Sequence, residues 1–486
     1  MTIFPQTFPA VAPAPLAVPI AVFEVLGYLS VVAVGTLCYL MGWLSVNAAG
    51  VLTVLLLSSL IVLAWKRFDQ GGHPCFLFLC TLLLFQGGRL IGFCLGVTDN
   101  PLDIELFTPA PFSLSREEAG IVLLAIVLSA ICVYAPCRWS YRRIAPPSDR
   151  DVRRYLPYLY VVFFFTISAS LIKNYLYFRY ALANGYMAFF TDYYRLAGTV
   201  PLPVRLIAPL DLPVFLALFV IETRKKYLWT IAALYFAVAA LYLAAGSRGG
   251  TLSLVLVVWY VARVKSSKRA RLLIPALLVV MLIGVAIAAD ANRDSPGGEQ
   301  LYILGPGQFI AQQGLSLNVT ELAIKYEHLF RPHIGAYLFH DLFEMFVPAD
   351  VSRYVPGGYL SWDMVVFLNP SLSKMGFGTG GSYLAEMYLV GGLGAVVVMS
   401  LLLGYVLNLI YACCSRAWGL IVVALILSDF LLMPRGDNLA WISTLMRNAI
   451  LFCPLVMGWW LFSLLTSFRG PAPGTLPPTP CGPASA

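Results

Sequence analysis

Residues 222–265 read ETRKKYLWTIAALYFAVAALYLAAGSRGGTLSLVLVVWYVARVK and contain the pattern that recurs along the whole chain. Two apolar runs, 228–245 and 251–264, are joined by a glycine-rich turn, and basic residues stand at the far end of each run. A membrane-spanning helix needs about 20 apolar residues, and cytoplasmic connections carry an excess of lysine and arginine. The stretch therefore predicts a hairpin of two membrane helices with its basic ends in the cytoplasm.

The composition of the chain points the same way. Of 486 residues, 60% are hydrophobic and only 12% are charged, and the mean hydropathy is +0.81. Soluble domains carry about 25% charged residues, so a string of soluble domains is excluded. We interpret the ten cysteines as small membrane hydrophobes, because their spacing is neither that of a metal site nor that of a disulfide framework. No metal and no cofactor are predicted.

Working outward from the hairpin, further apolar runs follow in both directions. The sixth run is interrupted by Pro209, Asp211 and Pro213, and the eighth is short. The sequence therefore predicts an all-α polytopic membrane protein with about twelve transmembrane helices. The predicted spans are 20–44, 47–65, 74–96, 118–136, 155–176, 206–221, 228–245, 251–264, 271–289, 383–411, 417–433 and 440–466.

Lysine and arginine are distributed unevenly between the connections. Those that follow the even-numbered spans hold most of the bases and few acids, whereas the alternate connections hold more acids than bases. The positive-inside rule then places both termini in the cytoplasm. This topology accounts for the formal net charge of +8, which therefore predicts no nucleic-acid partner.

The spans divide the chain into five parts. Residues 1–19 form a proline-rich cytoplasmic N-terminus, 20–289 hold spans one to nine, and 382–467 hold spans ten to twelve. Between them, 290–381 form one large outer loop, in which two apolar stripes predict amphipathic helices lying against the membrane domain. The length of the loop 290–381 suggests that it has a function. Residues 468–486 are predicted to be a disordered cytoplasmic tail.

Two of the predicted outer turns contain an arginine that is directly followed by a glycine. Arg248 lies in the G-S-R-G-G turn of 246–250, and Arg435 lies in P-R-G-D-N at 434–438. Glycine lets a backbone turn tightly and approach a ligand, and guanidinium groups bind phosphoryl oxygens in pairs. These turns predict a phosphate clamp. The alternative for Arg248 is a plain hairpin whose arginine reaches to lipid phosphates.

Two more arginines lie inside spans. Arg89 follows two glycines in the third span, and Arg447 lies in the twelfth. A charge inside a membrane is costly and faces a partner or a polar cavity. The two arginines are therefore expected either to form buried pairs with Glu24 or Asp429, or to border a cavity that opens outward.

The stretch 376–382 reads G-F-G-T-G-G-S and leads into the tenth span. Backbone N–H groups of Gly380 and Gly381 at a helix start suit an anion, although a simple hinge is the alternative. Glu386 follows within the span. His333, His340 and Glu386 are predicted catalytic bases, because a group-transfer reaction at the phosphate site would need a residue that takes up a proton. A solvated helix face is the alternative for the two histidines.

An aromatic cluster lies in the outer loop before the sixth span. Asp192, Tyr193 and Tyr194 stand beside Arg195. Aromatic rings with a carboxylate and an arginine form a reasonable sugar-binding surface, and they are equally typical of the aromatic belt at a membrane interface.

At these residues the chain resembles the Wzy-type O-antigen and oligosaccharide repeat-unit polymerases. The resemblance rests on G-S-R-G-G at 246–250, on the large outer loop and on G-G-S-x-x-x-E at 380–386. It implies a glycosyltransferase of the bacterial inner membrane that joins undecaprenyl-pyrophosphate-linked repeat units at the periplasmic face. A chain-length-regulating co-polymerase and a flippase are implied partners, beside the membrane lipids. The resemblance also implies functional arginines in two outer loops. The pyrophosphate-binding candidates are Arg89, Arg195, Arg248, Arg353, Arg435, Arg447, Gly380 and Gly381.

Two other functions stay open at this point. The related O-antigen ligases share the layout and use a histidine of the large loop, a role for which His340 or His333 would be the candidates. A transporter or flippase would also have about twelve spans. Equal halves or a central cytoplasmic loop would support that reading, and the sequence has neither.

Overall fold

A computed structural model describes residues 17–102, 112–147, 150–184, 196, 198–244, 249–265, 306–343, 359–371 and 379–467. Every regular element within these ranges is a helix, and they contain no strand, so the predicted all-α class is confirmed. Nine helices in the described ranges are long and apolar enough to cross a membrane. The protein is therefore a multi-pass membrane protein.

These nine helices match nine of the predicted spans. The sixth continues through Pro209 and Pro213 as α8, the short turn η2 and α9, so the prolines do not end it. Their bounds are α1 (Ala17–Leu40), α2 (Val46–Arg67), α3 (Pro74–Cys94), α4 (Arg116–Trp139), α5 (Leu156–Asn184), α8 (Leu202–Ile207) with η2 (Ala208–Leu210) and α9 (Asp211–Ile221), α20 (Tyr383–Cys413), α21 (Ala417–Leu432) and α22 (Ala440–Ser467).

The opening hairpin also forms helices. α10 (Lys225–Ala244) and α11 (Gly249–Lys265) occupy the places of the seventh and eighth predicted spans, and α11 has only 17 residues. The predicted ninth span, 271–289, lies outside the described residues. The count of twelve therefore stays a prediction.

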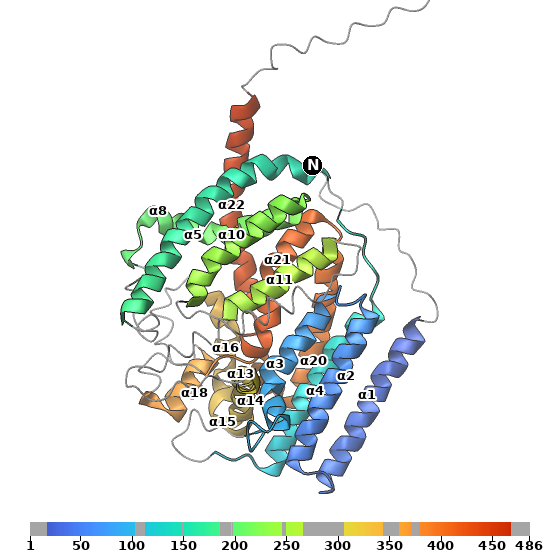
Figure 1. Cartoon of the computed structure of the whole chain (residues 1–486). Helices are drawn as coiled ribbons and strands as arrows, with labels where there is room; N and C mark the ends of the chain where they lie inside the picture. The colour runs from blue at the N-terminus through green and yellow to red at the C-terminus, as the bar shows by residue number, and fades with distance from the viewer. Residues whose placement is uncertain are drawn as a thin grey trace, which may run out of the picture.

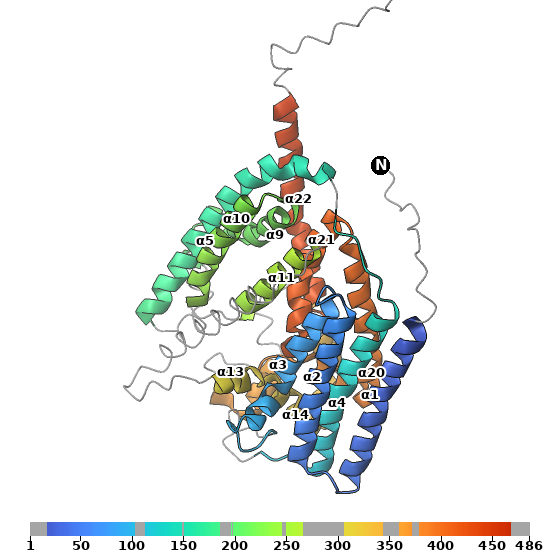
Figure 2. The ribbon, with the colours of Figure 1, turned by 45° about the vertical axis from the view of Figure 1, so that its right-hand side comes forward.

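The membrane helices form two groups that meet at α3 and α21 (Figures 1 and 2). One group consists of α1, α2, α3, α4 and α20. The other consists of α5, α9, α10, α11 and α21. α4 and α20 approach closely at Gly404, where a Cβ atom would lie 2.5 Å from the carbonyl oxygen of Val133. A glycine is needed there because no larger side chain fits between the two backbones.

Five shorter helices gather beside the lower parts of α3, α4 and α20. α13 (Pro306–Gln313), α14 (Ser316–Lys325), α15 (Glu327–Phe330), α16 (Ile334–Phe343) and α18 (Leu360–Leu368) lie in the lower part of Figure 1, and we call this side of the molecule the loop end. The opposite side, where α2, α4 and α11 end in basic residues, is called the basic end.

α14 differs from the amphipathic helix that the sequence suggested. Residues 316–324 are all buried, including the charged residue Glu321. The reason is that α14 contacts α3, α4 and α20 together. A helix enclosed on several sides has no free face for its polar residues.

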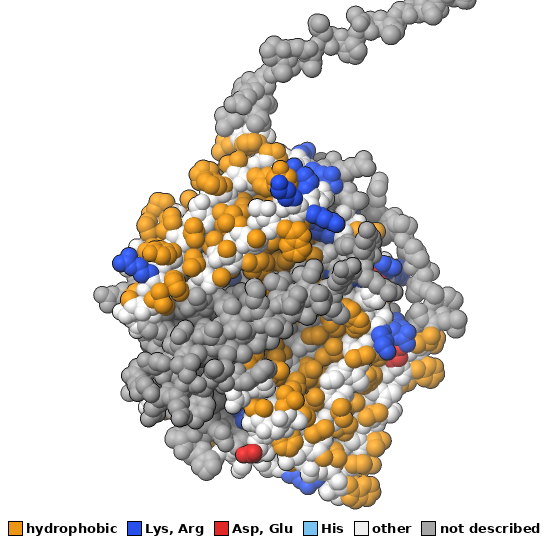
Figure 3. Space-filling model, in the orientation of Figure 1, with side chains coloured by type: hydrophobic (Ala, Val, Ile, Leu, Met, Phe, Trp, Pro, Cys, Tyr) orange, Lys and Arg blue, Asp and Glu red, His pale blue; other side chains and the backbone are white. Residues whose placement is uncertain are grey.

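Between the two ends the surface is apolar. Phe23, Phe164, Leu182 and Leu409 each expose more than 60% of their surface. Figure 3 shows hydrophobic side chains spread over both helix groups, with lysine and arginine gathered mainly near the helix ends. Such a surface suits lipid chains.

Candidate functional site

A buried amide at the loop end joins four elements. Gln86 of α3 is fully buried, and its Nε2 donates to Ser382 Oγ at 3.1 Å and to the carbonyl oxygen of Pro434. Its Oε1 accepts a hydrogen bond from Thr320 Oγ1 at 3.1 Å. Gln86, Thr320, Ser382 and Pro434 form what we call the polar junction. It ties α3, α14 and the start of α20 to η4 (Met433–Arg435), and thereby fixes the positions of the candidate residues around it.

Gly88, directly before Arg89, and Gly314 allow a backbone contact. A Cβ atom at Gly88 would lie 2.5 Å from the carbonyl oxygen of Ile310, and one at Gly314 would lie 2.2 Å from the backbone nitrogen of Arg89. The loop-end half of α3 and the end of α13 therefore touch through their backbones. This contact places Arg89 at the seam between the membrane helices and the helices of the loop end.

Arg89 itself is enclosed but has no ion pair within the described ranges. Its exposed fraction is 6%, and its Nε has no hydrogen-bond partner among the residues that the structure describes. Glu24, one of its two expected partners, instead binds Arg67 and Arg138 at the basic end. A pair between Arg89 and Glu24 is therefore excluded.

Arg435 lies close to the same part of α3. Its Nη1 donates to Gln313 Oε1 at 2.8 Å, and its guanidinium lies 5.7 Å from the centre of the Phe85 ring. Phe85 and Arg89 are four residues apart on α3 and so share one face of that helix. Two of the predicted phosphate-binding arginines thus both lie at the loop-end half of α3.

Glu386 and the glycines before it hold the turn that carries Arg435. Glu386 is 1% exposed, and its Oε2 accepts a hydrogen bond from the backbone N–H of Asn438 at 3.0 Å. A Cβ atom at Gly381 would lie 2.7 Å from Asp437 Oδ1, and Gly380 has φ = +79°, a conformation that favours glycine. Through this hydrogen bond Glu386 positions the turn that carries Arg435.

The two candidate histidines lie in different surroundings. His340 on α16 is 6% exposed, and its ring centre lies 3.5 Å from that of Tyr359, just before α18. His333 is exposed to solvent. Tyr337, between them, donates to Asp363 Oδ2 at 2.9 Å, and burial raises its pKa above the usual value. The structure does not bring the two histidines together as one site.

Arg447 has surroundings unlike those of Arg89. It is exposed on α22, its Nη2 donates to Thr444 Oγ1 at 3.2 Å, and it lies near enough to Asp429 for their charges to attract each other. Of the two arginines within spans, Arg447 is thus the one that meets an expected acidic neighbour. Six other candidates, Asp192, Tyr193, Tyr194, Arg195, Arg248 and Arg353, lie outside the described residues.

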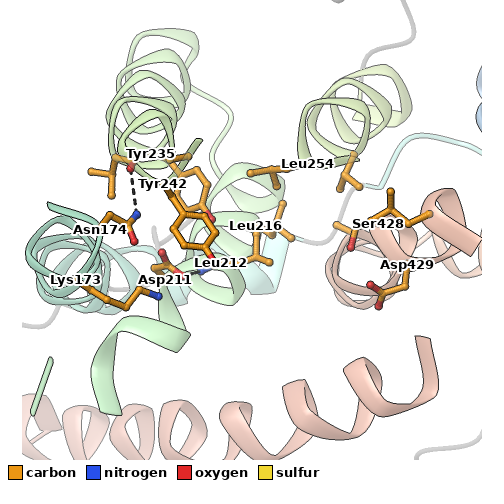
Figure 4. Close-up of a pocket in the computed structure, with 15 residues that line it drawn as sticks. Lys173, Asn174, Asp211, Leu212, Leu216, Tyr235, Tyr242, Leu254, Ser428 and Asp429 are labelled. Carbon is orange, nitrogen blue, oxygen red and sulfur yellow. Dashed lines mark hydrogen bonds between the residues drawn. The ribbon is translucent and has the colours of Figure 1, made fainter. Parts of the chain in front are cut away.

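A cavity within the spans was not predicted from the sequence. It has a volume of about 280 Å³ and lies between α5, α9, α10, α11 and α21 (Figure 4). Lys173, Asp211 and Asp429 are among its lining residues. The signal that could have found it is the presence of ionisable residues in predicted spans, since such residues mark functional sites.

A second group that the sequence spacing did not reveal lies at the basic end. The side chains of His73, Cys75 and Cys137 come within 4.8 Å of one another, all buried. His73 Nδ1 accepts a hydrogen bond from the backbone N–H of Cys75, so the ring proton is on Nε2, which faces Asn408 Oδ1 at 3.0 Å. Burial lowers the pKa of His73 to about 3. Both ring nitrogens are used within the protein, and none is left to bind a metal.

The helices and the loop-end site together define a class: a multi-pass membrane protein with a buried arginine and a second arginine at the seam between its spans and its large loop. The chain belongs to the O-antigen polysaccharide polymerase Wzy family, whose family model matches residues 20–464. The family expected from the sequence is therefore confirmed. Searches of the curated proteins and of the solved structures find no match.

Proposed function

We propose that this protein polymerises undecaprenyl-pyrophosphate-linked oligosaccharide repeat units into O-antigen or a related surface polysaccharide. Membership of the polymerase family supports the reaction class. The observation that carries the proposal for the site is Arg89, a buried cation with no ion pair in the described ranges, on the same helix as Phe85, over which Arg435 lies. A buried charge is retained where a ligand of opposite charge completes it, and a pyrophosphate is such a ligand.

In the proposed orientation the loop end faces the periplasm of a bacterial inner membrane, and both termini are cytoplasmic. The basic residues at the opposite end support it through the positive-inside rule. A membrane-anchored donor and acceptor would then meet at the seam where α3, α13 and η4 come together. Arg195, Arg248, Arg353 and Arg447 are proposed to contribute to the same anionic site.

In the proposed reaction, an acceptor hydroxyl oxygen bonds to the anomeric carbon of the donor sugar. The bond from that carbon to the pyrophosphate oxygen breaks, and its electron pair stays on the pyrophosphate. Arginines already in place would stabilise the charge that develops there. A base takes the hydroxyl proton, and His340, His333 or Glu386 is proposed for this task. Asp192, Tyr193 and Tyr194 are proposed to contact sugars. A co-polymerase that sets chain length and a flippase are proposed partners.

Complementation of a deletion strain tests the function. Wild-type protein should restore long polysaccharide, whereas Arg435→Ala should leave lipid cores that carry a single repeat unit. Arg435→Lys keeps the charge but cannot bind two phosphoryl oxygens side by side as a guanidinium does. It should therefore restore short chains only. Arg142→Ala, an exposed arginine of the basic end, is the matched control and should restore long chains.

The same gels distinguish the other two functions. A deletion strain with no O-antigen on its lipid core would indicate a ligase. Accumulation of lipid-linked repeat units on the cytoplasmic face would indicate a flippase. Long chains in the deletion strain would contradict the polymerase proposal altogether.

A further inference from the structure

The cavity of Figure 4 combines charged, polar and apolar side chains inside the membrane region. Lys173 and Asn174 come from α5, Asp211 from α9, Tyr235 and Tyr242 from α10, and Asp429 from α21. Ionisable side chains inside spans are costly and rare. Three of them around one cavity indicate a polar occupant rather than a lipid chain.

One wall of the cavity is held rigidly. Asp211 accepts hydrogen bonds from Ser170 Oγ and from the backbone N–H of Leu212, both at 2.6 Å, and Lys173 lies near enough to attract its charge. Asn174 Nδ2 donates to the carbonyl oxygen of Val238 at 3.1 Å (Figure 4). These contacts fix the polar groups of this wall before any ligand arrives.

The opposite wall carries an acceptor that is not used within the described ranges. Asp429 Oδ2 is buried and has no hydrogen-bond partner among the residues that the structure describes. Ser428 lines the cavity beside it. A buried carboxylate oxygen without a partner costs free energy, which a donor on a ligand would recover.

The balance of charge decides which ligand fits. Two carboxylates and one ammonium group line the cavity and Arg447 lies near Asp429, so the site offers no excess positive charge that would favour a pyrophosphate. Carboxylates, an amide and tyrosines are hydrogen-bond partners for hydroxyl groups, while Leu212, Leu216 and Leu254 offer apolar walls. The volume of about 280 Å³ is at the small end for a ligand pocket. It suits one or two uncharged sugar rings.

The cavity and the arginines are joined by one stretch of chain. Asp429 and Arg435 are six residues apart, and α21 continues directly into η4. At 1.5 Å of rise per residue their backbones are about 9 Å apart along the helix. One lipid-linked saccharide could therefore reach both places.

We propose that this cavity binds the uncharged saccharide part of the substrate, with Asp429 accepting a sugar hydroxyl. The proposal rests on the polymerase function argued above, and divides the work between two places. Arg89 and Arg435 bind the pyrophosphate, whereas the cavity between α5, α10 and α21 binds the sugar.

Binding measurements on the full-length protein in lipid nanodiscs test the division. The two probes are undecaprenyl pyrophosphate without sugar and the repeat-unit oligosaccharide cut from the lipid carrier of the same strain. Asp429→Asn should weaken oligosaccharide binding about tenfold, the effect of one hydrogen bond to a charged group. It should leave binding of undecaprenyl pyrophosphate unchanged. Arg435→Ala should show the reverse.

Two further variants guard against misfolding and unspecific effects. Leu254→Phe adds bulk to the cavity without changing its charges, and should also weaken the oligosaccharide alone. Asp99→Asn makes the same chemical change at an exposed position outside the cavity, and should change neither affinity. A variant that still binds undecaprenyl pyrophosphate normally is folded.

Unchanged oligosaccharide binding in both Asp429→Asn and Leu254→Phe would overturn the cavity proposal, and so would loss of pyrophosphate binding in those variants. The polymerase function would survive either result if wild-type protein still restores long chains. Failure of wild-type complementation would contradict the function instead, so the two failures are distinguishable.

Discussion

The two ends of the molecule treat their charges differently. At the basic end, charged side chains are neutralised by ion pairs: Glu24 binds both Arg67 and Arg138, and Asp69 binds Arg143 and Arg263. Glu222 follows the same pattern. It is buried at the end of α9, and the Arg224 guanidinium lowers its pKa to about 2.

At the loop end, a buried charge stands without such a pair in the described ranges. Arg89 is 6% exposed and has no ion pair there, while Arg435 lies at the same part of α3 and donates to Gln313. Arg331 and Glu327, four residues apart, do form an ion pair.

This difference in charge pairing distinguishes residues that stabilise the fold from residues that bind a ligand. Paired charges at the basic end hold helices together and anchor the orientation of the chain in the membrane. A buried charge without a pair reduces stability, so the presence of Arg89 at the loop end calls for a ligand that completes it. Substitutions at the two ends should therefore have opposite effects on activity and stability.

The largest effect is expected at Arg89. Arg89→Ala should abolish polymer longer than one repeat unit, because the pyrophosphate loses a buried cation worth on the order of 100-fold in rate. The melting temperature in detergent should stay the same or rise, since an unneutralised buried charge is removed. Gels of the polysaccharide and thermal unfolding of the purified protein measure the two effects.

Arg89→Lys is the conservative control for this site. It keeps the charge but not the paired geometry, and should restore part of the chain length. A melting temperature that falls by several degrees in Arg89→Ala, with activity per folded molecule preserved, would show instead that Arg89 is part of the scaffold.

A smaller effect of opposite kind is expected at Glu24. Glu24→Gln leaves Arg67 and Arg138 facing each other without a carboxylate, so the free energy of unfolding should fall by about 2 kcal/mol, less than for a fully buried pair. Activity per folded molecule should be unchanged. Thermal unfolding and polymer length are measured on the same preparations. Loss of polymer without loss of stability would remove the distinction between the two ends.

The fold was largely predictable because a membrane helix can be recognised from its own stretch of sequence. An apolar run of sufficient length is visible in any window of the chain, and nine of the predicted spans are found as helices of suitable length and hydropathy. Even the interruption at Pro209 and Pro213 did not break the sixth span, since a 3₁₀ turn between α8 and α9 accommodates the change in backbone.

The site was predictable only in part, because its contacts join distant segments. The sequence singled out Arg89, Arg435 and Gly381 by their types and neighbours. It could not show that Arg89 lies against Gly314, or that the turn of Arg435 is fixed by Glu386, since both contacts depend on how the helices pack. Asp211 interrupts the sixth apolar run, but nothing in the sequence around it indicates that it lies around one cavity with Lys173 and Asp429.

The smallest effect is expected at Arg331, an arginine of the loop end that does have an ion pair. Family resemblance makes every arginine of the large loop a candidate, yet Arg331 is exposed and its Nη1 lies 2.6 Å from Glu327 Oε1, four residues away. Such pairs contribute about 0.3–0.5 kcal/mol. Arg331→Ala should therefore support full-length polymer and unfold at nearly the wild-type temperature. Polymer capped at one unit in this variant would mean that an exposed, ion-paired arginine also binds substrate, and that burial without an ion pair, as found for Arg89, is not required for such a role.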